Sequence, residues 1–222
     1  WVREAAIEQR FWKDGVIVVT YRHSELSDVI DRGPVFQTVL DAQGLPTVNI
    51  FDTPTNIGSG TKDEIIVGLS LPFDRLGVKG ALLKGNLYIR DSKVTDPTTG
   101  EAREISFLRP LEWDATFSHD LPQWKMTYGA DVFGAFRQTG YRFNSIDHFK
   151  LRTYVRPFAE WRVRPDVQVR IELPNITSRG LRRTGQVFDG SRAVNPIPIR
   201  IEDREYQFGR MYYIRIRKSF GG

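Results

Sequence analysis

The chain has 222 residues, of which 40% are hydrophobic and 27% charged, so its composition excludes a disordered or low-complexity protein. It has no cysteine and only three histidines, which excludes disulfide scaffolds, thiolate metal sites and cysteine nucleophiles, and we expect no cofactor and no resident metal. The net charge is +5, but 27 acidic residues are interleaved with 32 basic ones, so the charge indicates no nucleic-acid partner.

The N-terminal residues do not form a signal peptide, because Trp1–Phe11 alternates charged and apolar residues without an apolar core. No apolar run reaches the length of about 18 residues that a transmembrane helix needs. Membrane β-barrels carry only short alternating segments, however, so the lack of a long apolar run does not exclude them.

Apolar and polar residues alternate with period two along most of the chain, which predicts strands rather than helices. The first two strands are the least cleanly separated, whereas in Val167–Leu173 every odd residue is apolar and every even residue is polar. Pro157 lies inside a predicted strand and predicts a bulge or local distortion, because proline donates no backbone hydrogen bond. The nine predicted strands, in chain order, are Ala5–Trp12, Val16–His23, Glu64–Ser70, Leu83–Arg90, Leu111–Leu121, Trp124–Arg137, Phe149–Val163, Val167–Leu173 and Phe208–Phe220.

Short and long connections alternate between these strands. Tight turns are predicted at Lys13–Gly15, Leu121–Gln123 and Arg164–Asp166, and a moderate one at Pro72–Gly80, from their content of Pro, Gly and Asp. In an up-and-down meander this alternation gathers the turns at one end and the long loops at the other, as in outer-membrane barrels. The long connections are Ser24–Thr61, Asp91–Pro110, Thr139–His148 and Ile176–Asp203.

Two architectures explain the alternation: a soluble sandwich or barrel with apolar faces inside, and a membrane barrel with apolar faces toward lipid. Charges of both signs on nearly every polar face, and strands of about ten residues, favour the membrane barrel. Aromatic residues beside the short turns resemble an interfacial girdle. They are Phe11, Trp12, Phe73, Trp124, Trp161 and Phe220.

We therefore predict an all-β fold, an antiparallel up-and-down meander of about nine strands that forms the C-terminal section of a large transmembrane β-barrel. Nine strands alone close only through a parallel pair, which even-stranded bacterial barrels avoid. Residues 1–222 are accordingly expected to be the C-terminal part of a larger barrel, without its plug domain and N-terminal strands.

The last two predicted strands resemble those of TonB-dependent outer-membrane receptors. The segment Phe208–Phe220 is similar to the final strand of that family, which runs Gly-Arg, aromatic residues, alternation and a terminal Phe; here Gly221 and Gly222 follow the aromatic residue. The segment Arg170–Thr177 is similar to the penultimate strand, where an apolar-Asn-apolar-Thr element leads into the last extracellular loop.

The resemblance implies an active importer in the outer membrane of a Gram-negative cell, with no catalysis. Its ligand would be a scarce compound such as a siderophore, cobalamin or an oligosaccharide, and no ligand-binding residue is assigned. Its partners would be outer-membrane lipid and lipopolysaccharide, the TonB complex through a region N-terminal to this chain, and the barrel-assembly machinery. The expected assembly signal comprises Tyr212, Ile214, Ile216 and Phe220.

Candidate catalytic groups all have simpler explanations. Glu112 and Asp114 share a strand face and are close enough for coupled carboxylates, but a polar interior with cross-strand ion pairs explains them equally. Ser118 and His119 point to opposite faces, which disfavours an outer-membrane phospholipase type of hydrolase. Gly58–Gly60 lacks the nucleophile-elbow pattern.

Two further motifs concern the surface. The sequence Asn175-Ile176-Thr177 matches a glycosylation sequon, although a bacterial barrel would leave it unmodified. Arg182, Arg183 and Arg192 in the last long connection are candidates for binding an anionic ligand or lipopolysaccharide phosphates.

Two alternative functions remain open. One is a passive porin or channel, which lacks a plug; the other is a soluble all-β domain that binds or hydrolyses carbohydrate. The soluble domain requires the larger apolar residues to be buried, whereas the barrel places them against lipid and Gln168 in the interior. The residues that discriminate are Trp113, Phe117, Val132, Ile171 and Ile216.

Overall fold

The computed structural model describes residues 1–220 and confirms the all-β fold, with two 3₁₀ turns as the only helical segments of that range. No helix in it is long and apolar enough to cross a membrane. The elements are β1 (Val2–Phe11), β2 (Gly15–Leu26), β3 (Ile30–Leu40), β4 (Pro46–Asn56), β5 (Gly60–Pro72), η1 (Asp74–Leu76), β6 (Ala81–Thr95), β7 (Ala102–Arg103), β8 (Leu111–Leu121), η2 (Pro122–Trp124), β9 (Met126–Phe133), β10 (Phe136–Tyr141), β11 (Ser145–Leu151), β12 (Tyr154–Arg164), β13 (Val167–Glu172), β14 (Gly180–Val187), β15 (Arg200–Gln207) and β16 (Tyr213–Lys218).

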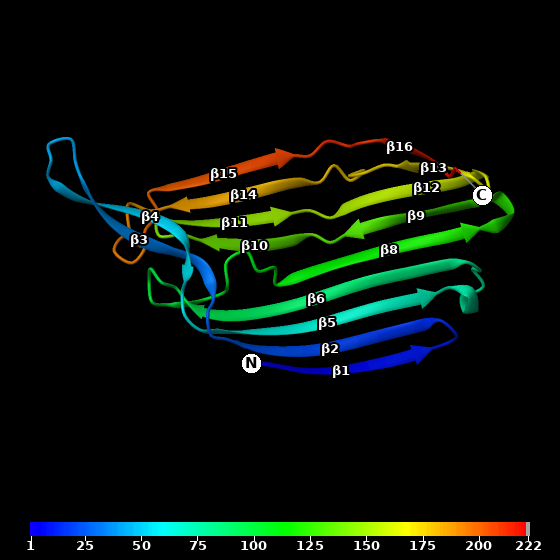
Figure 1. Ribbon diagram of the computed structural model, residues 1–222, viewed down its shortest axis with the longest axis horizontal. Coiled ribbons are helices and arrows are strands. Elements are labelled where there is room, and N and C mark those ends of the chain that lie inside the picture. Colours follow the sequence, from blue (N-terminus) through cyan, green and yellow to red (C-terminus); the bar gives the residue numbers. More distant parts are fainter. Residues whose placement is uncertain (221–222) are drawn as a thin grey trace.

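One large antiparallel sheet contains most of these strands, in the order β1-β2-β5-β6-β8-β9-β12-β13-β16, with the short β7 paired to β6. This is the predicted nine-strand meander, and the sheet is open: β1 and β16 are its unpaired edges within the described residues (Figure 1). A second sheet, β10-β11-β14-β15, continues the strands on the β9 to β16 side, and β3 and β4 form a separate hairpin.

All four predicted long connections contain strand residues that the alternation did not predict. Ser24–Thr61 contains β3 and β4, and Asp91–Pro110 contains the end of β6 and the short β7. Most of Thr139–His148 is strand, because β10 runs to Tyr141 and β11 starts at Ser145. Ile176–Asp203 likewise contains β14 and the start of β15. The alternation signal fails here because both faces of this second sheet carry charged or polar residues, so no apolar side marks the strand.

The two ends of the large sheet differ as predicted. The tight turns between β1 and β2, β8 and β9, and β12 and β13 lie at one end, on the right of Figure 1. The β3–β4 hairpin, the connection from β6 to β8 and the connection from β14 to β15 lie at the other end, on the left. We call these the turn end and the loop end.

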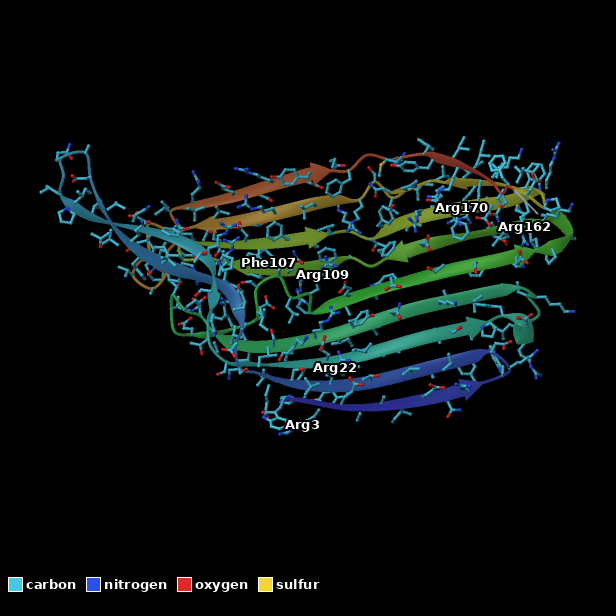
Figure 2. All side chains as sticks on the ribbon, viewed as in Figure 1. Arg3, Arg22, Phe107, Arg109, Arg162 and Arg170 are labelled. Carbon is cyan, nitrogen blue, oxygen red and sulfur yellow. The ribbon has the colours of Figure 1, made fainter. Side chains whose placement is uncertain are left out.

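Strand pairing assigns each residue of the large sheet to one of two faces. On the polar face, charges of opposite sign alternate across neighbouring strands, and Figure 2 labels three of the arginines on this face, Arg22, Arg162 and Arg170. An ion-pair ladder crosses five strands through Glu4–Arg22 (2.7 Å), Arg22–Glu64 (3.7 Å), Glu64–Arg90 (3.1 Å) and Arg90–Glu112 (2.8 Å). Shorter rows link Asp131 to Arg156 and Asp120 to Arg162.

The opposite face is apolar and open. It carries Leu71, Leu83 and Phe117 in register, and Val169 with Ile216 toward the β16 edge. Its exposed members include Ile7, Val19, Ile65, Ile89, Leu111, Trp161, Ile171, Ile214 and Ile216.

The buried apolar core lies elsewhere. Within residues 1–220 only five apolar residues are buried, and four of them belong to the loop end: Val29, Val94, Phe143 and Phe188. The described part of the chain therefore does not cover the apolar face of the large sheet with a second layer.

The expected distortion at Pro157 is also wrong. Pro157 pairs with Ala130 in unbroken register, and the irregularity of β12 lies instead between Arg162 and Arg164. The carbonyl of Pro157 accepts from the Leu173 N–H (3.0 Å), just beyond the end of β13. The backbone N and O of one residue in an antiparallel strand point to the same neighbouring strand, so the N–H that Pro157 lacks would point toward β13. The pairing of β12 with β13 already ends beside this position, so the missing donor does not interrupt it.

Candidate functional site

Four long strands are interrupted along one line of the structure. The interruptions are residues 134–135 between β9 and β10, 152–153 between β11 and β12, 173–179 between β13 and β14, and 208–212 between β15 and β16. We call this line the strand break; Figure 1 shows it crossing the upper half of the sheet.

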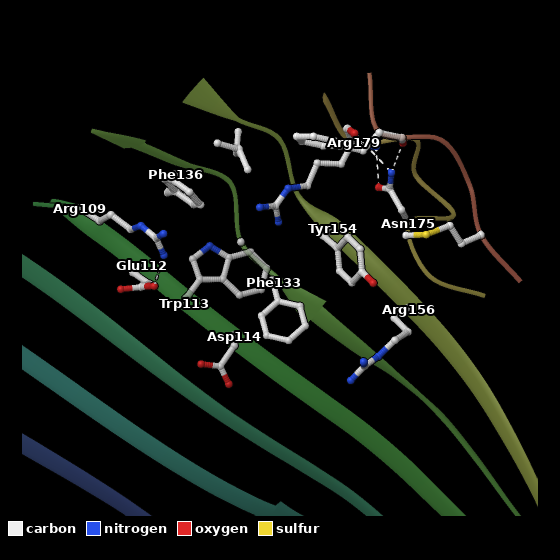
Figure 3. A pocket seen from close by; sticks show the side chains of 14 residues that line it. Arg109, Glu112, Trp113, Asp114, Phe133, Phe136, Tyr154, Arg156, Asn175 and Arg179 are labelled. Atoms are coloured by element: carbon white, nitrogen blue, oxygen red, sulfur yellow. Dashed lines mark hydrogen bonds and ion pairs between the residues drawn. The ribbon is translucent and has the colours of Figure 1, made fainter. Parts of the chain in front are cut away.

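A cavity of about 720 Å³ lies at the strand break, within the size range of small-molecule sites. Aromatic and charged side chains form most of its walls (Figure 3). It is lined by Arg109, Glu112, Trp113, Asp114, Phe133, Gly134, Phe136, Leu151, Tyr154, Arg156, Asn175, Arg179, Phe208 and Met211.

Asn175 organises the backbone of the break. Its side chain is almost fully buried, at 1% exposure, and its φ of 58° lies in the left-handed region that asparagine tolerates. Its Oδ1 accepts from the Arg179 N–H (2.7 Å), and its Nδ2 donates to the carbonyls of Arg179, Phe208 and Gly209. One side chain thus ties the interruption after β13 to the interruption before β16, and the predicted sequon is inaccessible to modification in this fold.

Residues of both sheet faces reach the cavity because strand pairing stops beside it. β8 pairs with β9 only as far as Asp114 with Phe133, and β10 pairs with β11 but not with β8. Trp113 shares the apolar face of Leu87, and its side chain also lines the cavity.

The alternation of faces also slips by one residue at the break. Phe133 and Phe136, three residues apart, both line the cavity, although period two places them on opposite faces. The guanidinium of Arg109 lies 3.7 Å from the ring centroid of Phe136, and Arg109 also pairs with Glu112 of the polar face (2.5 Å). The sequence grouped Phe136 with the apolar face and so missed its role.

The charged residues of the cavity are unequally paired. Glu112 binds Arg90 through Oε2 and Arg109 through Oε1, and Arg156 binds Asp131 at 2.9 Å. Those pairs are the cross-strand ion pairs that the sequence led us to expect. Glu112 and Asp114 do not form a pair of carboxylates that share a proton, since Asp114 Oδ2 accepts a hydrogen bond from the Asn86 amide (3.1 Å). The exception is Arg179, which forms no ion pair with any carboxylate of residues 1–220.

The remaining candidate residues show no catalytic arrangement in the described structure. His119 contacts the Tyr128 hydroxyl (3.0 Å) and the Lys79 carbonyl (3.1 Å), while Ser118 stands on the other face. Gly58 adopts a φ of 98° in the connection before β5. Within residues 1–220 no group of three or more histidine and acidic side chains is arranged to hold a metal ion.

The three arginines predicted to act together lie in different places. Arg182 pairs with Asp203 on the exposed surface, and Arg183 pairs with Asp147 (2.7 Å) on the opposite face of the same strand. Arg192 is buried and pairs with Asp96 at 2.7 Å, so it is unavailable to an external anion.

Arg192 belongs to a buried group at the loop end that we call the loop clasp: Asp31, Asp96, Arg103 and Arg192. Arg103 pairs with Asp31 (2.9 Å) and Asp96 (3.0 Å), and its guanidinium lies 4.6 Å from the ring centroid of Tyr141. The clasp joins β3, the connection from β6 to β8 and the connection from β14 to β15 into one body.

The residues of the expected assembly signal lie at the β16 edge. Ile214 and Ile216 belong to β16 and share its apolar face with their partners in β13. Tyr212 precedes the strand and Phe220 follows it, and all four side chains are largely exposed. Gly221 and Gly222 lie outside the described residues.

Comparison with protein-family models, with curated proteins and with solved structures finds no match to this chain.

Proposed function

We propose that this chain forms the C-terminal section of the wall of an outer-membrane β-barrel importer of the TonB-dependent receptor type. The observation that carries the proposal is the contrast between the two faces of one open meander: the ion-pair ladder on one face and an uncovered apolar band on the other. A lipid-facing exterior and a polar interior require this contrast.

The height of the apolar band fits a bilayer. In β12 the band runs from Val155 to Val163, about 27 Å of extended strand. At a tilt of about 40° this length spans roughly 20 Å, close to the band of about 25 Å on membrane barrels. Beyond the strand break both faces of β10-β11-β14-β15 are polar, as expected of strands that project into water.

The turn end carries the aromatic residues of an interfacial girdle. Trp12, Trp124 and Trp161 lie at or beside three tight turns and are 44%, 64% and 53% exposed. Indole rings favour the boundary between lipid and water, whereas a soluble domain gains nothing by exposing three of them in a row.

On this proposal the polar face surrounds the path of a scarce ligand, and the apolar band contacts lipid and lipopolysaccharide. The TonB complex supplies the energy, and the assembly machinery recognises the β16 edge with Tyr212, Ile214, Ile216 and Phe220. The protein acts as a receptor and transporter, without catalysis.

The test uses the native protein that carries this C-terminus. An antibody to the tail should detect, in fractionated cells, an outer-membrane band that is several times heavier than 25.6 kDa and that migrates differently before and after boiling. A soluble band at 25.6 kDa would refute the proposal and make the apolar face a core.

A conductance measurement separates the importer from the passive porin. The purified native protein is inserted into planar lipid bilayers and the current is recorded. A plugged receptor should stay closed, whereas a steady open conductance would identify a porin.

A further inference from the structure

Arg179 is the unexplained charge of the cavity. Its guanidinium extends from the segment between β13 and β14 toward the middle of the cavity, between Phe136 and Tyr154 (Figure 3). The ring centroids of those two residues lie 5.8 Å and 5.7 Å away. The protein therefore places an aromatic cradle around this cation without giving it a carboxylate.

The neighbouring acids do not neutralise Arg179. Glu112 already uses both oxygens on Arg90 and Arg109. Burial and the charge of Arg109 lower the pKa of Arg179, which lies outside the strands, so the site gains from an added negative charge.

The backbone holds Arg179 in this position. Asn175 Oδ1 accepts from the Arg179 N–H (2.7 Å) and Asn175 Nδ2 donates to the Arg179 carbonyl, so this clamp fixes the backbone from which the guanidinium extends. A guanidinium that is fixed before a ligand arrives pays less conformational entropy on binding an oxyanion.

The other end of the cavity disfavours a negatively charged group. Asp114 lies across the aromatic wall from Arg179 in Figure 3, and it accepts from Asn86 without a cationic partner. An anionic group is therefore attracted to the Arg179 end and repelled from the Asp114 end, which orients a ligand along the wall.

We propose that the cavity at the strand break binds a small anionic ligand that contains a planar ring. Its carboxylate, sulfonate or phosphate pairs with Arg179, and its ring packs against Phe136 and Tyr154. The proposal rests on the proposed function, because it names the ligand class of the same importer.

The test measures binding of three small probes to the purified native protein in detergent by ¹⁹F NMR, with empty micelles as the blank. The probes are 4-fluorobenzoate (ring and anion), 4-fluorobenzamide (ring only) and fluoroacetate (anion only). We expect 4-fluorobenzoate to bind at least about 10-fold more tightly than 4-fluorobenzamide, since a charged hydrogen-bonded pair contributes about that factor. It should also bind more tightly than fluoroacetate, which lacks the ring that packs against Phe136 and Tyr154.

Variants assign the preference to Arg179. Arg179→Gln should remove the preference for the carboxylate and leave 4-fluorobenzamide binding unchanged, and Arg179→Lys should retain part of the preference. The matched control is Arg152→Gln, since Arg152 also lies at the break but is exposed, pairs with Glu205 and does not line the cavity.

Equal binding of benzoate and benzamide, or an unchanged preference in Arg179→Gln, would overturn the assignment. So would an equal loss in Arg152→Gln. The location of the same protein in cell fractions separates the two proposals: an outer-membrane protein without the preference refutes only the ligand class, and a soluble protein refutes only the importer.

Discussion

The indole of Trp113 occupies the space over Gly134, and a Cβ built on Gly134 would lie 2.3 Å from Trp113 Nε1. The two residues lie where pairing between β8 and β9 ends, and the Gly134 N–H donates to the Trp113 carbonyl at 2.8 Å. The ring thus closes the gap that the strand break leaves in the sheet, and only glycine leaves room for it.

Gly134→Ala should displace the Trp113 ring. We expect a shift in the Trp113 emission, obtained as the difference between spectra with and without Trp113→Phe. The matched control is Gly68→Ala, since an added Cβ there meets only Asn86 Oδ1, at 3.9 Å. Identical spectra for Gly134→Ala and the parent protein would contradict the packing.

The two faces should differ in their tolerance of a charge. Leu87→Arg, on the apolar face, should destabilise the protein by about 2–4 kcal/mol, the cost of a cation near the bilayer midplane. Asn86→Arg, on the adjacent polar position, should cost close to nothing because Asp114 becomes its partner. Equal losses in the thermal stability of the detergent-solubilised variants would contradict the assignment of faces.

Gln168, which also lies on the polar face, is a less suitable control position. Strand pairing places Gln168 between Arg162 of β12 and Arg217 of β16, so an arginine there adds a third cation to the row. Asn86 has no such neighbours in register, being opposite Gly68 and Asp114.

Asn175→Ala should loosen the strand break. The variant leaves buried carbonyls without a donor and puts alanine at a φ of 58°, so we expect a loss of about 1–3 kcal/mol. Hydrogen exchange should rise at residues 173–179 and 208–212. Asn144→Ala, at an exposed loop position, is the control, and unchanged exchange in Asn175→Ala would refute the clamp.

Arg192→Met should loosen the loop clasp by leaving Asp96 with Arg103 as its one cationic partner. Removing one member of a buried ion pair costs about 3–5 kcal/mol locally. Hydrogen exchange should rise in residues 188–199, and Arg200→Met, which removes an exposed arginine paired with Glu202, should change little. Equal effects of the two variants would contradict the clasp.

The clasp should withstand mild acid. Burial alone would raise the pKa of Asp96, but hydrogen bonds from Arg192 and the Thr98 N–H outweigh it, and the net pKa is lowered; the pKa of Asp31 is also lowered, through Ser106 and Arg103. Because the folded pKa values lie below the unfolded value near 4, the stabilisation is complete above that pH and is lost as the pH falls through the folded values.

Spin labels at Ala102→Cys and Ala193→Cys report this, since these exposed positions lie on two of the connections that the clasp joins. The distance distribution between them should be the same at pH 7 and pH 5 and should broaden below about pH 4. Broadening between pH 7 and pH 5 would contradict the lowered pKa values.

Much of the large sheet could be predicted from the sequence, because its two faces meet different surroundings. Val167–Leu173 shows complete alternation, and its strand, turn and partners are as predicted. Residues 138–141 of β10 and 145–148 of β11 were missed as strand, since with both faces polar the period carries no contrast.

The cavity was beyond sequence reasoning for a related reason. It depends on a one-residue slip at residues 134–135 and on a side chain, Asn175, that was noticed only as part of a resemblance and a sequon. The one available signal was the interruption of alternation after Leu173, where Pro174 and Asn175 break the pattern. Arg179 follows that interruption, and nothing in the sequence pairs it with Phe136 or Tyr154.

The most direct test of the account is the accessibility of spin labels placed one at a time along β12 and β13 of the native protein in lipid vesicles. The chain itself has no cysteine, so each introduced cysteine is the single labelling site within it. Labels at Ala159, Trp161, Val169 and Ile171 should be relaxed strongly by oxygen and weakly by a water-soluble nickel chelate, and labels at Glu160, Gln168 and Arg170 should show the reverse. Low oxygen accessibility at the apolar positions, equal to that of a protein core, would show that this face packs against protein and would contradict the barrel.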